Sequence, residues 1–285
     1  MISLVVATLN RVTELERLLI SLDGQSYRNF EVVVVDQNPD DRLAPVLRRH
    51  EKLTIQHLRS EPGLSRSRNV GLRTASGEII TFPDDDCWYP EGLLASVAEW
   101  FESHREFGAL FATMRSGEGK PVGPRWPAGA CLCTKGNLWD SAVSTTGFLR
   151  RSATNAVGLF NENIGVGATS QFQSGEETDY YLRVLALGYP MWYEPSLTVH
   201  HPELNSIKRL RSASYPYALG SGYVMRVHGY SWGYLTNRLI RSMGGAAFSL
   251  FKGNIDMAQV YVMRAAGQLR GYCLGPRDLA RLAQS

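Results

Sequence analysis

Acidic side chains and histidines gather in three short segments of this 285-residue sequence. They are Asp84-Asp85-Asp86, Glu176-Glu177-Thr178-Asp179 and His200-His201. Three consecutive carboxylates repel one another, and a divalent cation relieves the repulsion because Mg²⁺ and Mn²⁺ prefer hard oxygen ligands. A neutral imidazole is a suitable additional ligand beside such carboxylates. The same residues also fit simpler roles, namely a solvated acidic turn, a capped first helical turn and histidines of the core or surface.

The elements that must position these segments show two alternating patterns over the first 110 residues. Short apolar runs are typical of strands buried on both faces, and apolar residues at helical spacing are typical of helices. The expected strands are 2–7, 30–35, 53–57 and 78–82, and the expected helices are 11–22, 43–50, 64–75 and 92–104. Strands alternating with helices indicate βαβ units, so we predict an α/β fold around a mainly parallel sheet.

Polar residues follow three of the expected strands. Thr8 and Asn10 come after the first strand, Asp36 ends the second, and Asp84 follows the fourth. Ligands of open α/β sheets bind outside the carboxyl ends of the strands. We therefore expect these side chains to converge on one edge of the sheet, where they would form a binding site.

The patterns change after residue 110. Residues 115–145 are rich in Gly, Pro and Trp, and we interpret them as loops and short strands around an acceptor site. A helix over 174–187 and a strand over 191–201 follow, and from about residue 207 the chain reads as helices separated by Gly and Pro. We divide the chain into a first domain, 1–204, and a helical extension, 205–285.

The net charge of +3 hides an asymmetry between these two parts. Residues 1–204 carry 19 Lys/Arg and 25 Asp/Glu, whereas residues 205–285 carry 11 Lys/Arg and 2 Asp/Glu. The extension is also rich in aromatic residues. Such a segment suits the anionic surface of a membrane, and the equally weighted alternative is a helical subdomain that only packs on the first domain. No nucleic-acid recognition motif appears, so nucleic acid is not an expected partner.

The cysteines and the apolar segments bear on cellular location. The four cysteines have no paired CxxC spacing, which argues against a structural zinc site and favours reduced thiols. No basic and apolar leader opens the sequence, and no apolar run is long enough to span a bilayer. We expect a cytoplasmic protein that is either free or attached peripherally to the cytoplasmic face of the membrane.

Several motifs occur in a characteristic order. They are Val5-Val6-Ala7-Thr8-Leu9-Asn10-Arg11, Ser21-Leu22 with Gln25-Ser26, Glu31 to Asp36, Gly63 with Arg68-Asn69 and Gly71, Gly77 to Asp86, and Gly175-Glu176-Glu177 with Asp179. Over residues 1–204 this set resembles family 2 of the bacterial glycosyltransferases. The resemblance implies a GT-A fold with a single nucleotide-binding domain and an inverting transfer of sugar from a nucleotide diphosphate.

The resemblance also implies roles for the residues that match. Those implied to bind the nucleotide sugar are Ala7, Thr8, Asn10, Asp36, Arg68, Asn69, Asp84, Asp85 and Glu176. Asp36 would accept a hydrogen bond from the imide of uracil or thymine, which favours a UDP or dTDP donor, although guanine can also donate. The implied ligands of Mn²⁺ or Mg²⁺ are Asp85, Asp86 and His200, with either aspartate as the main one.

An inverting transfer needs a general base that takes a proton from the attacking hydroxyl. The resemblance places Glu177 in this role, with Asp179 in reserve. The expected function is therefore transfer of a sugar to a hydroxyl of a glycan or lipid-linked glycan in polysaccharide biosynthesis. Two alternatives stay open, which are a metal-dependent nucleotidyltransferase and a non-catalytic protein that binds nucleotide or glycan.

Overall fold

The computed structural model describes residues 1–203 and 206–274. The chain divides into two compact units, which are described separately here. The first comprises residues 1–62, 66–160 and 180–203, and the second comprises residues 63–65, 161–179 and 204–285.

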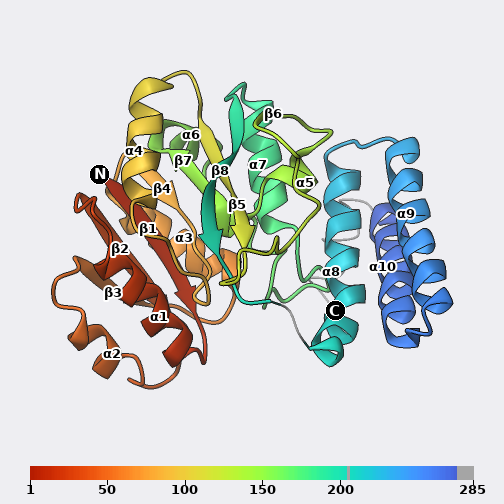
Figure 1. The fold of residues 1–285 in the computed structure, drawn as a ribbon, viewed down its shortest axis with the longest axis horizontal. Helices are drawn as coiled ribbons and strands as arrows, with labels where there is room; N and C mark the ends of the chain where they lie inside the picture. The colour runs from red at the N-terminus through yellow and green to blue at the C-terminus, as the bar shows by residue number, and fades with distance from the viewer. Residues whose placement is uncertain (204–205, 275–285) are drawn as a thin grey trace. The chain divides into compact units, whose positions relative to one another are not determined.

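The strands of the first unit form one eight-stranded sheet in the order β3-β2-β1-β4-β7-β5-β8-β6 (Figure 1). Their bounds are β1 Ile2–Thr8, β2 Phe30–Asp36, β3 Ile55–Arg59, β4 Ile79–Thr81, β5 Ala109–Arg115, β6 Cys131–Cys133, β7 Gly147–Arg150 and β8 Met191–His200. Only β7 and β6 run against their neighbours, and the other pairings are parallel. The predicted α/β fold around a mainly parallel sheet is confirmed.

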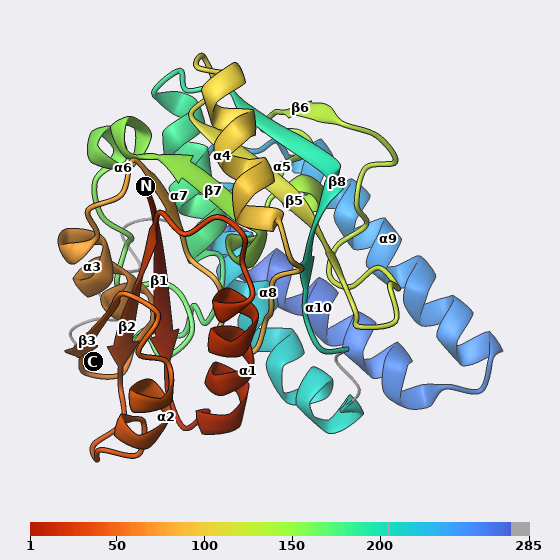
Figure 2. The ribbon, with the colours of Figure 1, turned by 60° about the vertical axis from the view of Figure 1, so that its left-hand side comes forward.

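Helices cover both faces of this sheet (Figure 2). Their bounds are α1 Val12–Asp23, α2 Ala44–Arg49, α3 Leu64–Thr74, α4 Leu93–Ser103, α5 Leu138–Ser141, α6 Arg151–Val157 and α7 Glu176–Ala186, with a 3₁₀ turn, η1, at Ser144–Thr146. The apolar stripes of α1 and α4 pack with Leu4 and Val32 in one large hydrophobic cluster. On the opposite face, α3 lies against Val5 and Val35. The hydrophobic core therefore consists of two layers, one on each side of the sheet.

The register of β8 contains a bulge. The partner in β8 is Glu194 for Ala112 of β5 but Thr198 for the next residue, so residues 195–197 are left out of the pairing. Side chains of a strand alternate between the two faces of the sheet. Trp192 before the bulge and Val199 after it nevertheless contact the same hydrophobic cluster. The bulge therefore reverses the alternation of the strand before it reaches the two histidines.

A close approach between α3 and the sheet depends on Gly71. A Cβ atom at this position would lie 2.3 Å from Val5 Cγ1 and 3.1 Å from Val35 Cγ2. Because overpacking forces side chains or backbone to move, we expect Gly71→Ala to lower the free energy of unfolding by about 1–3 kcal/mol in urea denaturation. Gly129→Ala is the matched control, since nothing lies within 4 Å of its added Cβ. Equal losses in the two variants would contradict the packing explanation.

The second unit is built around three helices, α8 Ile207–Val227, α9 Trp232–Phe251 and α10 Ile255–Cys273. Helix α10 packs against both α8 and α9 (Figure 1). The segment before α7 lies on α8, where the ring of Phe172 stacks on Tyr223 with centroids 4.3 Å apart. Among the described residues, no helix is long and apolar enough to cross a membrane.

Candidate active site

The carboxyl ends of β1, β2 and β4 bring the predicted polar residues to one edge of the sheet. Thr8 and Asp36 are register partners, so β1 and β2 end side by side. Strand β4 leads through Phe82 and Pro83 into the aspartate triplet. The backbone N–H of Cys87 donates to the carbonyl of Asp84 over 3.2 Å, which closes a turn through the triplet.

The middle carboxylate, Asp85, is held inside the protein. Arg11 Nη1 lies 2.7 Å from Asp85 Oδ1 and 2.6 Å from Asp86 Oδ2, so one guanidinium spans two carboxylates of the triplet. Burial raises the pKa of Asp85 to about 6, although the Arg11 charge and the Thr8 hydroxyl favour its ionised form. The cation of Arg11 therefore already offsets part of the repulsion within the triplet.

The carboxylates of Asp84 and Asp86 lie close to the side chain of His201. Ligand atoms of Asp84, Asp86 and His201 all lie within 4.8 Å of one another, and His201 Nε2 is 3.1 Å from Asp86 Oδ1. A bridge of two backbone hydrogen bonds between Trp88 and His200, each 2.9 Å, ties the end of β8 to the segment after the triplet. This bridge places His201 beside Asp86. Two carboxylates and one imidazole form a set that suits a divalent cation.

The two adjacent histidines differ in their surroundings because side chains alternate along a strand. His200, which the sequence favoured as the metal ligand, stacks on the ring of Trp88 with centroids 5.4 Å apart. Its Nδ1 lies 3.2 Å from the carbonyl of Ser116. His201, rather than His200, is the histidine that the structure brings to Asp84 and Asp86.

The ring of His201 is oriented by a backbone carbonyl. Its Nδ1 lies 2.7 Å from the carbonyl oxygen of Pro202, which can only accept, so Nδ1 carries a proton. In the neutral ring Nε2 is then the lone-pair nitrogen, and it faces Asp86. Burial opposes the charged ring, but the interactions with Asp86, the Pro202 carbonyl and Asp84 together outweigh it and raise the pKa of His201. Asp86 therefore favours positive charge at Nε2 of His201.

Arg68 and Asn69 of α3 play different parts. The side chain of Arg68 is only 2% exposed, donates from Nη2 to Ser144 Oγ over 2.9 Å and lies 3.5 Å from Asp84 Oδ1. It therefore adds positive charge beside the triplet, as a diphosphate site requires. The amide of Asn69 instead bonds both backbone groups of Phe160, at 3.0 and 2.8 Å. Asn69 thereby holds the loop at Phe160 in place.

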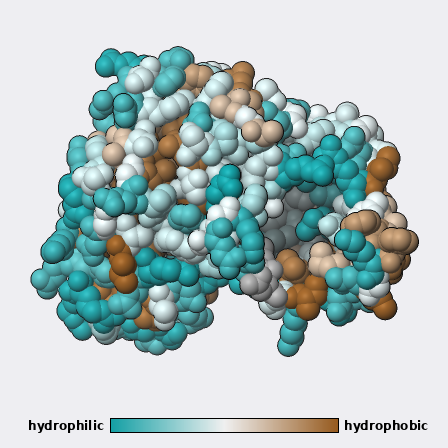
Figure 3. All heavy atoms as spheres, in the orientation of Figure 1, coloured by the Kyte–Doolittle hydropathy of each residue, from teal (hydrophilic) through white to brown (hydrophobic). Residues whose placement is uncertain are grey.

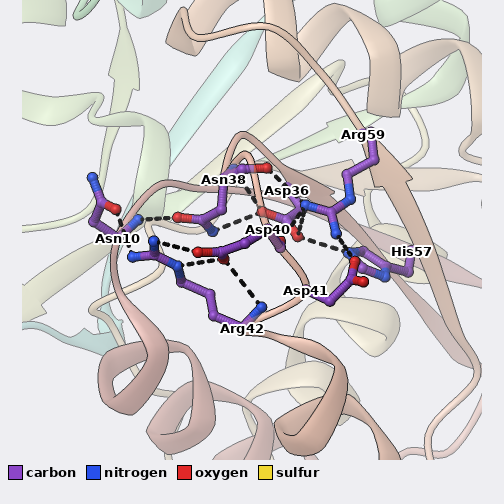
Figure 4. Close-up of polar contacts among 8 residues, drawn as sticks. All are labelled: Asn10, Asp36, Asn38, Asp40, Asp41, Arg42, His57 and Arg59. Atoms are coloured by element: carbon purple, nitrogen blue, oxygen red, sulfur yellow. Dashed lines mark hydrogen bonds and ion pairs between the residues drawn. The ribbon is translucent and has the colours of Figure 1, made fainter.

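A second polar network lies where β1 and β2 end (Figure 4). Asp36 is fully buried at its centre. One carboxylate oxygen accepts from the backbone N–H and side-chain amide of Asn38, at 2.8 and 2.7 Å. The other oxygen lies 3.0 Å from His57 Nε2 and 2.9 Å from Arg59 Nη1. Four donors of the chain itself therefore surround the carboxylate that the sequence assigned to the nucleotide base.

The rim of this network is formed by Asn10 and its neighbours. Asn10 has a positive φ of 61°, and its backbone N–H donates to Asn38 Oδ1 over 2.8 Å. Its side-chain oxygen accepts from Arg42, which is also paired with Asp40. Ala7 and Thr8, which are also implied to bind the nucleotide sugar, are the last two residues of β1. Ala7, Thr8, Asn10 and Asp36 thus lie on one connected edge, with Asp36 fully buried.

The predicted base and its neighbours occupy the first turn of α7, in the second unit. Gly175, with φ +94°, precedes this turn, and a Cβ there would lie 2.9 Å from Val224 Cγ2. Glu176 and Asp179 are buried, and Asp179 Oδ1 lies 2.8 Å from His228 Nε2. Glu177 is half-buried and is the most accessible of the three acids in this turn.

Several residues of the site were not named as candidates from the sequence. Arg17 donates from Nη2 to the backbone carbonyl of Asp86 over 2.5 Å, and its guanidinium lies 4.3 Å from the centroid of Trp88. Arg11 lies in the motif after the first strand but was given no role, whereas His201 was considered beside His200 and not preferred. His57 and Arg59 lie on β3, and only the pairing of β3 with β2 reveals that they face Asp36.

Comparison with known proteins decides the family. The sequence model of "Glycosyl transferase family 2" matches residues 3–149, which is more than half of the chain. The chain belongs to glycosyl transferase family 2. The mixed α/β sheet of this chain is of the GT-A type. A solved structure with the same fold is the mannosyltransferase PcManGT from Pyrobaculum calidifontis in complex with GDP-Man and Mn²⁺. Its TM-score is 0.62 at 18% identity, over 94% of this chain and 86% of that one.

Two curated relatives are similar over a shorter region. An uncharacterized glycosyltransferase of Haemophilus influenzae is 38% identical over 92 residues, which cover 32% of this chain and 31% of the relative. The GalNAc(5)-diNAcBac-PP-undecaprenol beta-1,3-glucosyltransferase of Campylobacter jejuni is 31% identical over 103 residues, which cover 34% and 33% of the two chains. The matched region of the chain thus spans about a third of the length of these two relatives.

Proposed function

We propose that this protein is an inverting glycosyltransferase that moves a sugar from a nucleoside-diphosphate donor to a hydroxyl of a glycan or lipid-linked glycan. The observation that carries the proposal is that Asp84, Asp86 and His201 lie together beside the side chains of Arg11 and Arg68, in a chain of this family. Residues 1–204 would form the catalytic domain and residues 205–285 its extension. The name of the Campylobacter relative, which contains a polyprenol diphosphate, supports a lipid-linked acceptor.

The donor set fits a divalent cation. Asp84 and Asp86 offer carboxylate oxygens, and His201 offers Nε2 with its ring oriented by Pro202. We propose these three residues as the metal ligands, in place of Asp85 and His200. When bound, Mn²⁺ or Mg²⁺ neutralises negative charge that develops on the leaving diphosphate. The PcManGT complex contains Mn²⁺, which supports this choice of metal.

The other residues of the triplet would prepare the site for the diphosphate. Arg11 favours the ionised form of Asp85 inside the protein and contacts the proposed ligand Asp86 as well. Arg68 lies between Asp84 and Ser144, where its charge would stabilise the phosphate groups of the donor. The positive charges of Arg11 and Arg68 would offset the carboxylates of the triplet, so that the site could accept an anionic diphosphate.

The transfer itself is a single displacement. The acceptor oxygen attacks C1 of the sugar, and the bond from C1 to the diphosphate oxygen breaks with its electron pair leaving on the nucleoside diphosphate. The carboxylate of Glu177 takes the proton of the attacking hydroxyl. Glu177 is half-buried whereas Asp179 is buried, which favours the more accessible Glu177 as the base. One displacement at C1 inverts the configuration of the sugar.

The nucleotide base would lie at the edge formed by Asn10, Asp36 and Asn38. An imide N–H of uracil or thymine can bond Asp36 only if one of its four present donors moves away. We retain UDP or dTDP as the proposed nucleotide, and expect purified protein with Mn²⁺ to release nucleoside diphosphate faster from UDP- or dTDP-sugars than from GDP-sugars. Faster turnover of a GDP-sugar would contradict this preference.

The same assay separates the proposed reaction from its rivals. Release of a nucleoside diphosphate, with the sugar on the acceptor in inverted configuration, supports transfer. Release of pyrophosphate would instead identify a nucleotidyltransferase. Binding of nucleotide sugars in a thermal-shift assay without turnover, across donors and in the presence of Mn²⁺ and polyprenol-linked glycans, would identify a binding protein and overturn the proposal.

A further inference from the structure

Helix α9 presents its larger apolar side chains outward. The residues that it buries are Leu235, Ser242, Ala246 and Ser249, three of which are small. Its exposed apolar residues are Trp232, Ile240, Met243, Phe248, Leu250 and Phe251. A surface helix of a globular protein normally buries its apolar stripe and exposes its polar one. Packing within the protein therefore leaves the most hydrophobic side of α9 uncovered.

These six exposed residues form one continuous stripe, here named the α9 apolar face. At 3.6 residues per turn, positions three, seven or eleven residues apart lie on the same side of a helix. Ile240 and Met243 are three apart, Met243 and Leu250 are seven apart, and Ile240 and Phe251 are eleven apart. Ile240 is 66% exposed and Phe251 is 88% exposed. Hydrophobic surface gathers over α9 at the right-hand side of Figure 3.

Cations border the α9 apolar face. Arg241 is exposed one position after Ile240, and Lys252 Nζ lies 4.6 Å from the ring centroid of Phe248. Within residues 206–274, which the structure describes, the single acidic residue is Asp256, and Arg211 pairs with it at 2.8 Å. An aromatic and aliphatic stripe with a cationic margin is the pattern of helices that lie in a membrane interface.

We propose that the α9 apolar face docks on a lipid bilayer that contains anionic phospholipids. Its aromatic residues would enter the boundary between headgroups and acyl chains, while Arg241 and Lys252 would contact the phosphate groups. A second copy of this chain is a poorer occupant. A symmetric contact would bring the two cationic margins together, where they repel. The proposal rests on the exposed helix face and does not depend on the chemistry of transfer.

The apolar part of the surface is tested by vesicle flotation of the full-length protein. The variant is Ile240→Ser/Phe251→Ser, and the matched control is Ile20→Ser/Leu187→Ser. The control removes two apolar side chains that are 59% and 53% exposed in the first unit. We expect the α9 variant to bind phosphatidylcholine–phosphatidylglycerol vesicles roughly tenfold more weakly than the unmodified protein, and the control to bind normally. Equal binding by all three proteins would overturn the proposal.

The charged part is tested with Arg241→Glu/Lys252→Glu, compared with Arg48→Glu/Arg105→Glu. We expect only the α9 charge variant to lose the preference for vesicles that contain phosphatidylglycerol over pure phosphatidylcholine. Added salt should weaken binding of the unmodified protein, because salt screens attraction to anionic headgroups. No preference for anionic vesicles in the unmodified protein would overturn the choice of lipid.

Two further measurements keep the result interpretable. Circular dichroism and release of nucleoside diphosphate from the donor should be unchanged in the α9 variants, because no residue of this face belongs to the candidate active site. Sedimentation velocity without lipid reports the oligomeric state. A dimer of the unmodified protein that dissociates in Ile240→Ser/Phe251→Ser would show that a second copy covers the α9 apolar face, and would overturn the membrane proposal.

Discussion

We expect His201→Gln to weaken Mn²⁺ binding by about 100-fold or more and to lower sugar transfer in parallel. Nε2 of His201 lies 3.1 Å from Asp86 Oδ1, within the group formed with Asp84. Glutamine keeps much of the side-chain length but lacks the imidazole lone pair. Isothermal titration with Mn²⁺ measures the loss directly, and donor turnover over a range of Mn²⁺ concentrations measures its effect on catalysis.

The neighbouring histidine provides the control. His200→Gln removes an imidazole one position earlier, but this ring stacks on Trp88 and bonds toward Ser116. We expect His200→Gln to retain Mn²⁺ affinity within a few-fold and to reduce mainly thermal stability. Loss of Mn²⁺ binding in His200→Gln, with normal binding in His201→Gln, would restore His200 as the ligand. Asp86→Asn should resemble His201→Gln, since both change the same pair.

Replacing the proposed base has the second large effect. We expect Glu177→Gln to lower kcat for transfer by about 10²- to 10⁴-fold, the usual contribution of a general base, with donor binding unchanged. The amide has nearly the same shape and cannot take the proton of the acceptor. The acid limb of the pH–rate profile should disappear in the variant, which a purely structural role of Glu177 would not cause.

Asp179 is the matched comparison for Glu177 because both are acids of the same helical turn. Its Oδ1 lies 2.8 Å from His228 Nε2, and the residue is buried. We expect Asp179→Asn to lower the free energy of unfolding by about 1–3 kcal/mol, while its pH–rate profile keeps the acid limb. If Asp179→Asn abolished transfer and Glu177→Gln did not, the proton would go to Asp179.

The sequence predicted strands β1 to β4 well, because each of these elements has its own local pattern. Continuous apolar runs such as 30–35 have few alternatives to a buried strand, and β2 covers Phe30–Asp36. It did not predict β5 or β7 as strands. Strand β7 has only four residues, Gly147–Arg150, and it forms because β4 and β5 offer unpaired edges on either side. Such tertiary pairing leaves no local pattern to detect.

In the candidate site, too, features that depend on local sequence could be predicted, and features that depend on contacts between distant residues could not. Asp36 and Asp84 each come at the carboxyl end of a predicted parallel strand. Their position at one edge of the sheet could therefore be predicted. That Asp36 already has four donors could not, because His57 and Arg59 reach it only through the pairing of β3 with β2. The orientation of Asp85 toward Arg11 likewise depends on contacts between residues 74 positions apart. The residue types suggested which ligands the site would bind. The folded chain determines which of their atoms are available for binding.

The bulge at residues 195–197 has a consequence for how histidine pairs in this family should be interpreted. Because it leaves an odd number of residues out of the register with β5, it decides which of two successive side chains faces the aspartates. Paired residues of neighbouring strands point to the same side of a sheet, and after the bulge His200 is the partner of Arg115. The choice of His201 as the proposed metal ligand therefore depends on the register of β8 after the bulge, and not only on the order of the two histidines in the sequence.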